Sequence, residues 1–516
     1  MAEAMASQGE MKRTLTLTGV TVNAMALIAP GAFLWTTFEE QAALTRHGAS
    51  TGGEMWTGLL FALVLAMLTA YSYSELARVF PEAGTGSSYY FAEAALLTKA
   101  DPKHRGRARV AKLAFGWISH LYYWIYPGIM VAFTATLFGY IYGACFHHNL
   151  SYLPLAAICV VFAFATGYIA YRGINGSTMT SIAILVIQTI SLIGVTIWFI
   201  AYRIGHSHQA WAIANAGRVI IPHNYINMLY QSTIAILLLV GFESITALGA
   251  EAIDPGKNIK RGVMISLLIQ GGFCYLFEYF GADFASGTHT LAATKGTAAF
   301  TAAGANSAPI GTMLQQTIHH GGVAISVVVA ITVLIALIGT TLACLNTGVR
   351  VTYSMAKDKE MPSILGLLHG EYVTPHAGIW ILVTVSAALG IFGANPKQVD
   401  NLTQITLASN TGTFLVYGMT CIIALVAFAS RHDRHPIKHF LIPGLGAFMN
   451  IAELLGVLYI ALTGSGTAPG DATKAIGIVV VWCLIGVIWV AANPNRRHAL
   501  QVHEDKLADP NPVPTV

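Results

Sequence analysis

The most informative run of this 516-residue chain reads Leu237-Leu-Leu-Val-Gly-Phe-Glu-Ser-Ile-Thr-Ala-Leu-Gly-Ala-Glu-Ala-Ile-Asp-Pro-Gly-Lys-Asn-Ile-Lys-Arg261. It begins in an apolar segment long enough to cross a membrane, yet it contains Gly241 and the ionisable Glu243. A carboxyl group in a spanning helix is costly unless it faces a cavity or a partner. Non-helical backbone at membrane depth is tolerated only where protein or a wetted cavity surrounds it. The run therefore predicts an interrupted helix that lines a solute pathway.

The composition is that of an integral membrane protein. Hydrophobic residues make up 55% of the chain and charged residues only 10%, whereas soluble proteins average about 25% charged residues. Twelve apolar segments are long enough to span a bilayer. They lie at about 15–39, 54–76, 113–145, 151–171, 177–203, 226–250, 262–285, 321–348, 377–394, 403–429, 439–463 and 474–492. We therefore expect an all-α integral membrane protein with twelve transmembrane helices.

The basic residues predict how the chain is oriented. With the N-terminus inside, all but six of the 28 Lys and Arg residues fall on the inner side. The six exceptions are Arg46, Arg203, Arg218, Lys295, Lys397 and Lys474. Because basic residues concentrate in cytoplasmic loops, we expect a multi-pass protein of the cell membrane with both termini in the cytoplasm. The net charge of +4 reflects these loops and predicts no nucleic-acid partner.

A second interruption is expected in the first span, which contains Ala26-Leu-Ile-Ala-Pro-Gly-Ala-Phe33. Pro30 removes a backbone donor, and Gly31 directly after it removes stiffness. Spans 1 and 6 are five apart, so they cross the membrane in opposite directions, as in an inverted repeat of five plus five helices. The alternative interpretation is that Pro30-Gly31 only kinks the helix.

This pattern predicts the organisation of the chain. We expect a cytoplasmic tail at 1–14, a twelve-helix transporter domain at 15–492 and a second cytoplasmic tail at 493–516. Within the domain, repeat one covers about 15–203, repeat two about 226–429, and helices 11 and 12 about 439–492. Each half-helix end exposes unpaired N–H or C=O groups with partial charge. Two such ends meeting near the midplane can hold a zwitterion or a cation.

Four motifs carry a resemblance to a known family. They are Ala29-Pro-Gly-Ala-Phe-Leu34, Tyr73-Ser-Glu-Leu-Ala-Arg-Val-Phe-Pro-Glu-Ala-Gly-Thr-Gly-Ser-Ser-Tyr-Tyr90, Gly241-Phe-Glu…Ala-Glu251…Asp-Pro255…Lys257…Lys260-Arg-Gly262 and Arg350-Val-Thr-Tyr-Ser-Met-Ala-Lys-Asp-Lys-Glu-Met-Pro362…Thr374-Pro375. In their order and spacing the chain resembles the amino acid–polyamine–organocation (APC) superfamily of secondary transporters. The resemblance implies the leucine-transporter-type fold with discontinuous helices 1 and 6. It also implies alternating access and a substrate held between spans 1, 3, 6, 8 and 10.

The resemblance further implies a binding site at the two breaks. Backbone amides at the first break hold an α-carboxylate, and carbonyls at both breaks hold an α-ammonium. The implied positions are Leu27, Ile28, Ala29, Pro30, Gly31, Ala32, Leu237, Val240 and Gly241. The chain departs from the family's amino acid carriers, which have Gly-Ser-Gly-like residues at the first break. Because Pro30 cannot donate a hydrogen bond, an amine or polyamine substrate stays open.

Further candidate residues lie in the apolar spans. Glu243 matches a position where relatives carry an acidic residue implicated in proton coupling; the alternative is a structural carboxylate bonded to backbone at the break. Tyr123 and Tyr126 share a helix face roughly one turn apart, where aromatic rings can meet a cationic amine. Asn410, in the polar island Ser409-Asn410-Thr411, either lines the cavity or bonds to another helix.

The coupling partner is left open by the residues. Thr340 and Thr341 in span 8 are candidate ligands of a sodium site, as in sodium-coupled members of this fold. Span 5 contains no lysine, which some proton-coupled relatives place there as a substitute for sodium. The candidates are therefore H⁺, Na⁺ or a counter-substrate.

The leading hypothesis is a secondary active transporter of amino acids across the cell membrane, proton-coupled or working by exchange. The alternative is a polyamine or other organic-amine transporter of the same superfamily. An enzyme is not expected, because the chain lacks a metal-spaced His/Asp/Glu motif, a nucleophile elbow and a nucleotide loop. No cofactor or metal site is expected, and the partners are a small-molecule substrate, a coupling ion and lipid. The choice between monomer and homodimer stays open.

Overall fold

The computed structural model describes most of the chain. The described residues are 16–28, 30–46, 49–80, 88–97, 105–173, 178–206, 220–248, 252–287, 308–398, 400–429, 431–463 and 469–492. They form helices apart from one short antiparallel pair, in which β1 (Thr45–Arg46) meets β2 (Ala49–Ser50) with Thr45 opposite Ser50. The expected tails at 1–14 and 493–516 lie outside the described residues.

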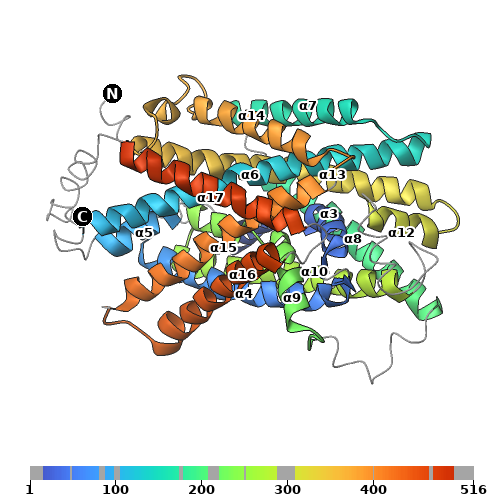
Figure 1. Cartoon of the computed structure of the whole chain (residues 1–516), viewed down its shortest axis with the longest axis horizontal. Coiled ribbons are helices and arrows are strands. Elements are labelled where there is room, and N and C mark those ends of the chain that lie inside the picture. Colours follow the sequence, from blue (N-terminus) through green and yellow to red (C-terminus); the bar gives the residue numbers. More distant parts are fainter. Residues whose placement is uncertain are drawn as a thin grey trace.

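Ten helical segments among the described residues are long and apolar enough to cross a membrane. The helices concerned are α4 (Met55–Val79), α6 (Arg105–Phe146), α7 (Tyr152–Tyr171), α8 (Thr178–His206), α10 (Pro255–Gly287), α13 (Gly322–Lys357), α14 (His376–Gly393), α15 (Asp400–Ala429), α16 (Ile442–Thr463) and α17 (Pro469–Ala492). Each overlaps one of the apolar segments expected from the sequence. In Figure 1 these helices run roughly along the long axis of the molecule, and α7 lies beside α14, against which it packs.

The sixth segment is divided instead of continuous, and the first is described as two helices on either side of one residue. The first consists of α2 (Leu17–Ile28) and α3 (Pro30–Ala43), which leaves Ala29 outside the described residues. Proline is tolerated as the first residue of a helix, where its missing N–H would have had no partner. The sixth consists of α9 (Tyr225–Ala235), the 3₁₀ turn η5 (Ile236–Leu238) and the 3₁₀ segment η6 (Phe242–Leu248). Gly241 between them has φ +114°, a conformation that glycine adopts without strain.

Helix boundaries differ from the expected spans at several ends. The helix α10 begins at Pro255 instead of near 262, so the Pro/Gly pair starts this helix and does not precede it as a turn. The helix α6 begins at Arg105 instead of near 113, and α13 continues to Lys357 instead of ending near 348. Hydropathy marks only the part of a helix that fits the hydrocarbon core. The polar turns that extend these helices were therefore missed.

Four further helical elements were also not expected. They are η1 (Gly52–Glu54), α5 (Ser88–Leu97), α12 (Pro309–Thr317) and η7 (Ser363–Gly366). A short π-helical turn, η8 (Ile437–Leu441), leads into α16. The helix α5 packs against α6 and α15, and α12 packs against α3 and α13. These short helices cover the ends of the long ones, and their apolar stretches are too short to read as spans.

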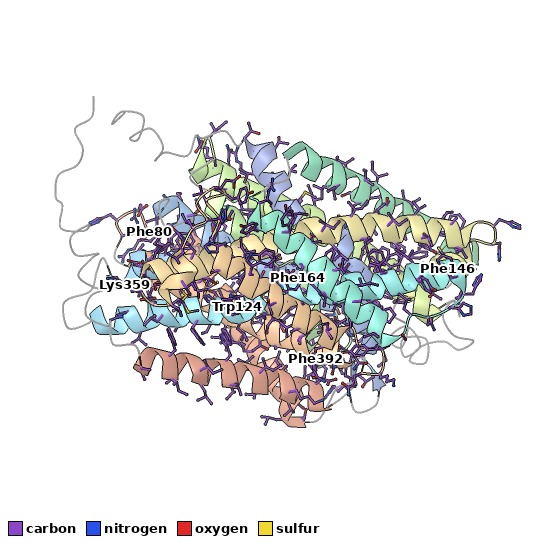
Figure 2. All side chains as sticks on the ribbon, turned by 90° about the horizontal axis from the view of Figure 1, so that it is seen from above. Phe80, Trp124, Phe146, Phe164, Lys359 and Phe392 are labelled. Carbon is purple, nitrogen blue, oxygen red and sulfur yellow. The ribbon has the colours of Figure 1, made fainter. Side chains whose placement is uncertain are left out.

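Polar contacts between helix ends show that these ends gather on two opposite faces of the molecule. On one face, which we call the Lys260 face, Lys260 near the start of α10 donates to Glu75 near the end of α4, with Nζ 2.8 Å from Oε1. Lys112 near the start of α6 donates to Asp358 just after α13, with Nζ 2.7 Å from Oδ2. Phe80 and Lys359, which follow α4 and α13, lie toward the same end of the molecule in Figure 2.

The opposite face, which we call the Glu54 face, gathers the other helix ends. Oε1 of Glu54 accepts the N–H groups of His223 and Asn224 at 2.8 and 3.1 Å, immediately before α9. Gln404 near the start of α15 donates to Asp471 near the start of α17 at 2.7 Å. Phe146, the last residue of α6, lies at this opposite end in Figure 2. Consecutive long helices thus run in alternating directions.

The last long helix, α17, is fastened to α6 by two tryptophans. Nε1 of Trp117 donates to the carbonyl of Trp482 at 2.7 Å, and Nε1 of Trp482 donates to the carbonyl of Trp117 at 2.9 Å. Their rings stack with centroids 4.9 Å apart. The approach is possible because Gly486 has no side chain: a Cβ atom there would lie 2.4 Å from Cδ1 and Nε1 of Trp117.

We expect Gly486→Ala to destabilise the protein by about 1–3 kcal/mol, because the added methyl group would overpack the tryptophan pair. The matched control is Gly477→Ala on the same helix, where no described heavy atom lies within 4 Å of the added Cβ. The control is expected to be neutral or to stabilise by up to about 1 kcal/mol, because alanine is the better helix former. Thermal unfolding of the purified variants in detergent measures both. Equal melting temperatures for the two variants would contradict the tryptophan contact.

Candidate functional site

The two interrupted segments lie side by side and run in opposite directions. The helix α2, which precedes the first break, packs against η6, which follows the second. The helix α3, which follows the first break, packs against α9 and η5, which precede the second. The N-terminal half of the first segment therefore lies beside the C-terminal half of the sixth, and the C-terminal half of the first lies beside the N-terminal half of the sixth. This arrangement places the adjoining ends of α2 and α3 beside the break in the sixth segment.

Side chains of other helices reach the backbone of the second break. Val240 N–H donates to the Ile236 carbonyl at 3.1 Å, which closes the turn after η5. The amide of Gln270 on α10 donates to the Leu238 carbonyl, and Tyr126 on α6 has its hydroxyl 3.5 Å from the Leu237 carbonyl. Backbone polar groups at a helix end need such partners when they are buried.

Glu243 is the centre of the site and is fully buried. Its Oε2 accepts the Tyr417 hydroxyl at 2.6 Å and the Gly241 N–H at 3.2 Å. Its Oε1 accepts the Tyr123 hydroxyl at 3.2 Å. Tyr417 belongs to α15 and Tyr123 to α6. One carboxyl group thus closes the backbone break and joins the sixth segment to two other spans.

The hydrogen-bond pattern indicates which form of Glu243 the site suits. All three of its partners are donors in this arrangement, and an ionised carboxylate is an acceptor only. If Oε1 or Oε2 of Glu243 were protonated, its new O–H group would need a hydrogen-bond acceptor where a donor now lies. Phenol hydroxyls can rotate to accept, so protonation would rearrange the bonds to Tyr123 and Tyr417. The carboxyl group can therefore change how tightly the sixth segment is held.

A layer of aromatic rings packs against this carboxyl group. The ring of Tyr417 lies 5.9 Å from that of Tyr73 and 5.1 Å from that of Phe242, centroid to centroid. The Tyr73 hydroxyl is hydrogen-bonded to Ser88 of α5, and Oγ1 of Thr420 lies 3.2 Å from it. Tyr73 and Ser88 both belong to the second of the four motifs. The motif therefore supports the layer around Glu243.

Several of the expected site residues lie at or beside the break in the sixth segment. Tyr123 and Tyr126 both reach the sixth segment, as their shared helix face predicted. Buried positions at or beside the second break are held by Leu237, Val240 and Gly241. Leu27, Ile28, Pro30, Gly31 and Ala32 lie in the ends of α2 and α3, where the structure describes the backbone alone, and Ala29 lies outside the described residues.

Asn410, Thr340 and Thr341 are buried near the same segments. The Asn410 amide donates to the Thr233 carbonyl of α9 at 2.8 Å, which is the helix-to-helix bond anticipated as one of its two roles. Thr340 and Thr341 donate to the Ala336 and Leu337 carbonyls of their own helix at 3.1 and 2.6 Å. Their oxygens keep lone pairs that can accept or ligate. A role in sodium binding stays a prediction.

Tyr417 is a site residue that the sequence analysis did not name. It lies two helical turns after Asn410 on α15, so the two residues share a helix face. That spacing was the available signal, but it becomes informative only once Asn410 is known to face the sixth segment. Among the described residues, no group of three or more His, Cys, Asp or Glu side chains is placed to hold a metal ion.

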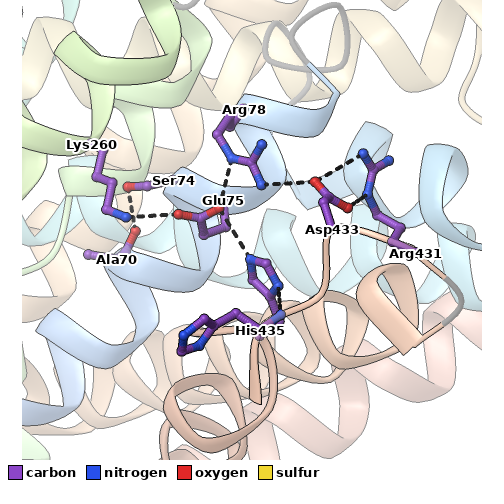
Figure 3. A network of polar contacts seen from close by, with 9 residues as sticks. Ala70, Ser74, Glu75, Arg78, Lys260, Arg431, Asp433 and His435 are labelled. Atoms are coloured by element: carbon purple, nitrogen blue, oxygen red, sulfur yellow. Dashed lines mark hydrogen bonds and ion pairs between the residues drawn. The ribbon is translucent and has the colours of Figure 1, made fainter. Parts of the chain in front are cut away.

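A second polar network lies on the Lys260 face and is shown in Figure 3. Glu75 is paired with Lys260 and with Arg78, whose Nε lies 2.8 Å from Oε2. Nε2 of His439 lies 3.5 Å from the same oxygen. Asp433 contacts Arg78 at 3.6 Å. Glu75 and Arg78 come from the second motif and Lys260 from the third, so this network joins α4 to α10 and to the start of α16.

A third network joins α6 to the segment after α13. Lys112 lies between Glu93 and Asp358, 2.7 Å from an oxygen of each. The Tyr89 hydroxyl oxygen lies 2.8 Å from Oδ2 of Asp358 and 2.6 Å from Oε2 of Glu360, and its one proton is shared between these two carboxyl groups. Burial raises the pKa of the Glu360 carboxyl from its ordinary value of 4.5 to about 7, and the Lys112 ammonium opposes part of that rise. This carboxyl group therefore changes charge near neutral pH.

Known proteins resemble this chain along most of its length. A family model described as amino acid permease matches residues 40–502. The low-affinity putrescine importer PlaP of Escherichia coli (strain K12) is 25% identical over 490 residues, which cover 93% of this chain and 95% of the relative. The branched-chain amino acid permease BcaP of Bacillus subtilis (strain 168) is 22% identical over 489 residues, 92% of this chain and 90% of the relative. The methylthioribose transporter of Bacillus subtilis (strain 168) is 22% identical over 476 residues, 89% of each chain.

We expect Glu360→Gln to flatten the pH dependence of stability. A carboxyl group whose pKa is raised on folding contributes stability that is present below its unfolded pKa and is lost as the pH rises through its folded pKa. The window for Glu360 therefore runs from 4.5 to about 7. Over that window the wild type should lose up to about 3 kcal/mol that the variant does not lose. Thermal unfolding of both proteins across this pH range measures the difference, and parallel curves would contradict it.

Proposed function

This chain belongs to the amino acid permease family of the APC superfamily, and we propose that it carries amino acids across the cell membrane as a secondary active transporter. Its family consists of permeases and not of enzymes. The observation that carries the proposal is the broken sixth segment, which packs antiparallel to α2 and α3 and whose Glu243 is held by Tyr123 and Tyr417. Such a site exposes backbone polar groups to a small solute at membrane depth.

The proposed topology has twelve spans. It counts the ten long helices and adds the two interrupted segments, in two inverted repeats of five with α16 and α17 outside them. The Lys260 face is the cytoplasmic face in this proposal, and both termini lie there. The excess of basic residues on that side supports the orientation. Binding alternates between the two faces as the halves of the broken segments move against their neighbours.

Helix-end charges favour a zwitterionic substrate. If the first segment is interrupted as we propose, the N-terminus of α3 carries positive partial charge there, which suits a carboxylate. The C-terminus of α2 then carries negative partial charge at the same place, which suits an ammonium group. The carbonyls near Leu237 add acceptors from the other segment. An α-amino acid carries both charges on one carbon and fits this pair of ends.

A polyamine or other organic amine is the second candidate substrate. Pro30 is the first residue of α3 and lacks an N–H, so one carboxylate donor is missing at the end where it is needed. A relative that imports putrescine is similar along nearly the whole chain. An amine without a carboxylate would use the acceptors at the breaks and leave the start of α3 unused.

The proposed coupling runs through Glu243. As a carboxylate it holds η6 to α6 and α15 through two phenol hydroxyls. Proton uptake would exchange these bonds and release the segment, so movement of the segment and transfer of the proton are linked. Sodium binding at Thr340 and Thr341, or exchange against a counter-substrate, are the other coupling modes that the residues allow.

Competition of uptake tests the substrate class. Cells expressing the protein are given radiolabelled L-leucine with an excess of unlabelled L-amino acids, putrescine or spermidine. We expect the amino acids to compete and the polyamines to have little effect, because α3 offers a positive end to the carboxylate. Saturable uptake of radiolabelled putrescine that no α-amino acid inhibits would instead identify the protein as an amine transporter. Cells without the protein give the background.

Glu243→Gln tests the coupling in proteoliposomes. We expect uptake driven by an imposed pH gradient to fall about tenfold or more, because an amide cannot load a proton and loses the charge-assisted bond to Tyr417. Exchange of labelled for unlabelled substrate, which needs no net proton movement, should be affected less. Glu278→Gln is the matched control, since Glu278 is also a fully buried carboxyl group but lies on α10. Full gradient-driven accumulation by Glu243→Gln would rule out proton coupling at this residue.

A further inference from the structure

Three helix faces meet between the breaks and the Glu54 face. Their members are three or four residues apart on each helix, so they share one face. They are Thr37 and Glu40 on α3, Tyr230 and Thr233 on α9, and Thr406 and Asn410 on α15. We call these six residues the Glu40 column. It follows α3 away from the first break, toward the face from which α9 and α15 begin.

Two hydrogen bonds close the column. The Thr406 hydroxyl donates to Oε1 of Glu40 at 3.2 Å, which joins α15 to α3. The Asn410 amide nitrogen donates to the Thr233 carbonyl at 2.8 Å, which joins α15 to α9. The helix α3 also packs against α9. The three faces therefore lie against one another in the interior of the protein.

Four polar atoms of the column have no hydrogen-bond partner among the described residues. They are Oε2 of Glu40, Oδ1 of Asn410, Oη of Tyr230 and Oγ1 of Thr37. The Glu40 side chain is 3% exposed and that of Asn410 is 0% exposed. Buried polar atoms in native proteins are nearly always satisfied by protein, water or ligand. The column thus presents two acceptor oxygens, those of Glu40 and Asn410, and two hydroxyl groups that can accept or donate.

The orientation of these acceptors is fixed by the bonds they already make. Because the Thr233 carbonyl can only accept, the nitrogen of Asn410 must face it, and Oδ1 must point elsewhere. A carboxylate and an amide oxygen cannot donate to each other, so neither can satisfy the other. Burying an uncompensated carboxylate is expensive, and a cation in contact with it removes that cost. The chemical complement of the column is a positively charged group with N–H donors.

Thr406 differs from three other threonines of its helix in the partner of its hydroxyl group. The hydroxyls of Thr411, Thr413 and Thr420 donate to carbonyls of α15 itself. The Thr406 hydroxyl instead turns to Glu40, across the gap between α15 and α3. It therefore bonds to one carboxylate oxygen, and the other, Oε2, has no hydrogen-bond partner among the described residues.

We propose that the Glu40 column is an ammonium subsite that holds the protonated primary amine of the substrate on its way between the Glu54 face and the breaks. The proposal rests on the proposed transport of amine-bearing solutes and names where the amine binds first. An ammonium group has three N–H donors. Oε2 of Glu40 and Oδ1 of Asn410 take two of them, and Oη of Tyr230 takes the third. An α-amino acid and a diamine both present this group.

Site-directed labelling tests the subsite without requiring transport. Purified Thr406→Cys protein is reacted with 2-aminoethyl methanethiosulfonate, which carries a primary ammonium, and with neutral methyl methanethiosulfonate. Mass spectrometry of the peptide containing residue 406 gives the ratio of the two labelling rates. We expect Glu40→Gln in the Thr406→Cys background to lower the rate of the ammonium reagent relative to that of the neutral reagent about tenfold. A buried ammonium–carboxylate contact contributes at least this much.

The matched control is Glu39→Gln in the same background. Glu39 is the neighbouring buried carboxyl group of α3 and projects about 100° away from Glu40 around the helix. The control should leave the ratio unchanged. A ratio that ignores Glu40→Gln, or that falls equally with Glu39→Gln, would overturn the subsite. That outcome would leave the proposed transport function standing, because labelling does not depend on uptake.

Influx kinetics then show whether the ammonium group that binds belongs to an amino acid or to a diamine. Initial rates are measured for L-leucine and for putrescine supplied from outside the cell. Glu40→Gln should raise the KM of the transported compound about tenfold with little change in kcat, and Glu40→Asp should restore part of the loss. Thr406→Val keeps the carboxyl group and should raise KM about threefold, which covers the case in which Glu40→Gln fails to fold. An unchanged KM in both variants would contradict the subsite, whereas absent uptake of either compound by the wild type would contradict the proposed function.

Discussion

Inside a bilayer every backbone N–H and C=O must find a partner within the protein, and this requirement governs the centre of the molecule. A helix can be opened there only if other groups take over the hydrogen bonds it gives up. Glu243 does so for the sixth segment, because its carboxyl group accepts the Gly241 N–H. The same group accepts hydroxyls from α6 and α15. The repair of the backbone and the attachment of the segment to its surroundings are therefore one interaction.

The other polar networks have a different character, because each joins helix ends on a single face. Glu75 fastens α4 to α10, and Lys112 fastens α6 to the segment after α13. On the opposite face, Glu54 holds the start of α9. Bonds of this kind keep groups of helices together as units. The bonds of Glu243 cross the centre, from the broken segment to the helices around it, and the geometry makes them the natural place for a change of state.

Much of this architecture can be predicted from local sequence patterns, because long apolar runs mark the ten long helices. Pro30 marks the start of α3, and Gly241 marks the second break because the backbone there needs a positive φ. Tyr123 was predicted from helical spacing alone. Tyr417 and the Glu75–Lys260 pair were not, because they depend on which helix faces meet in space. The early start of α10 at Pro255 was missed because its first turn is polar and lies outside the apolar run.

The central claim is that two broken segments meet to bind an amine-bearing solute beside Glu243. An electron cryo-microscopy map of the protein with a saturating concentration of its transported substrate tests this most directly. We expect density for the substrate between the end of α2 and the Leu237 carbonyl, with both segments interrupted. Continuous helices through Pro30 and Gly241, or substrate density away from the breaks, would contradict the claim.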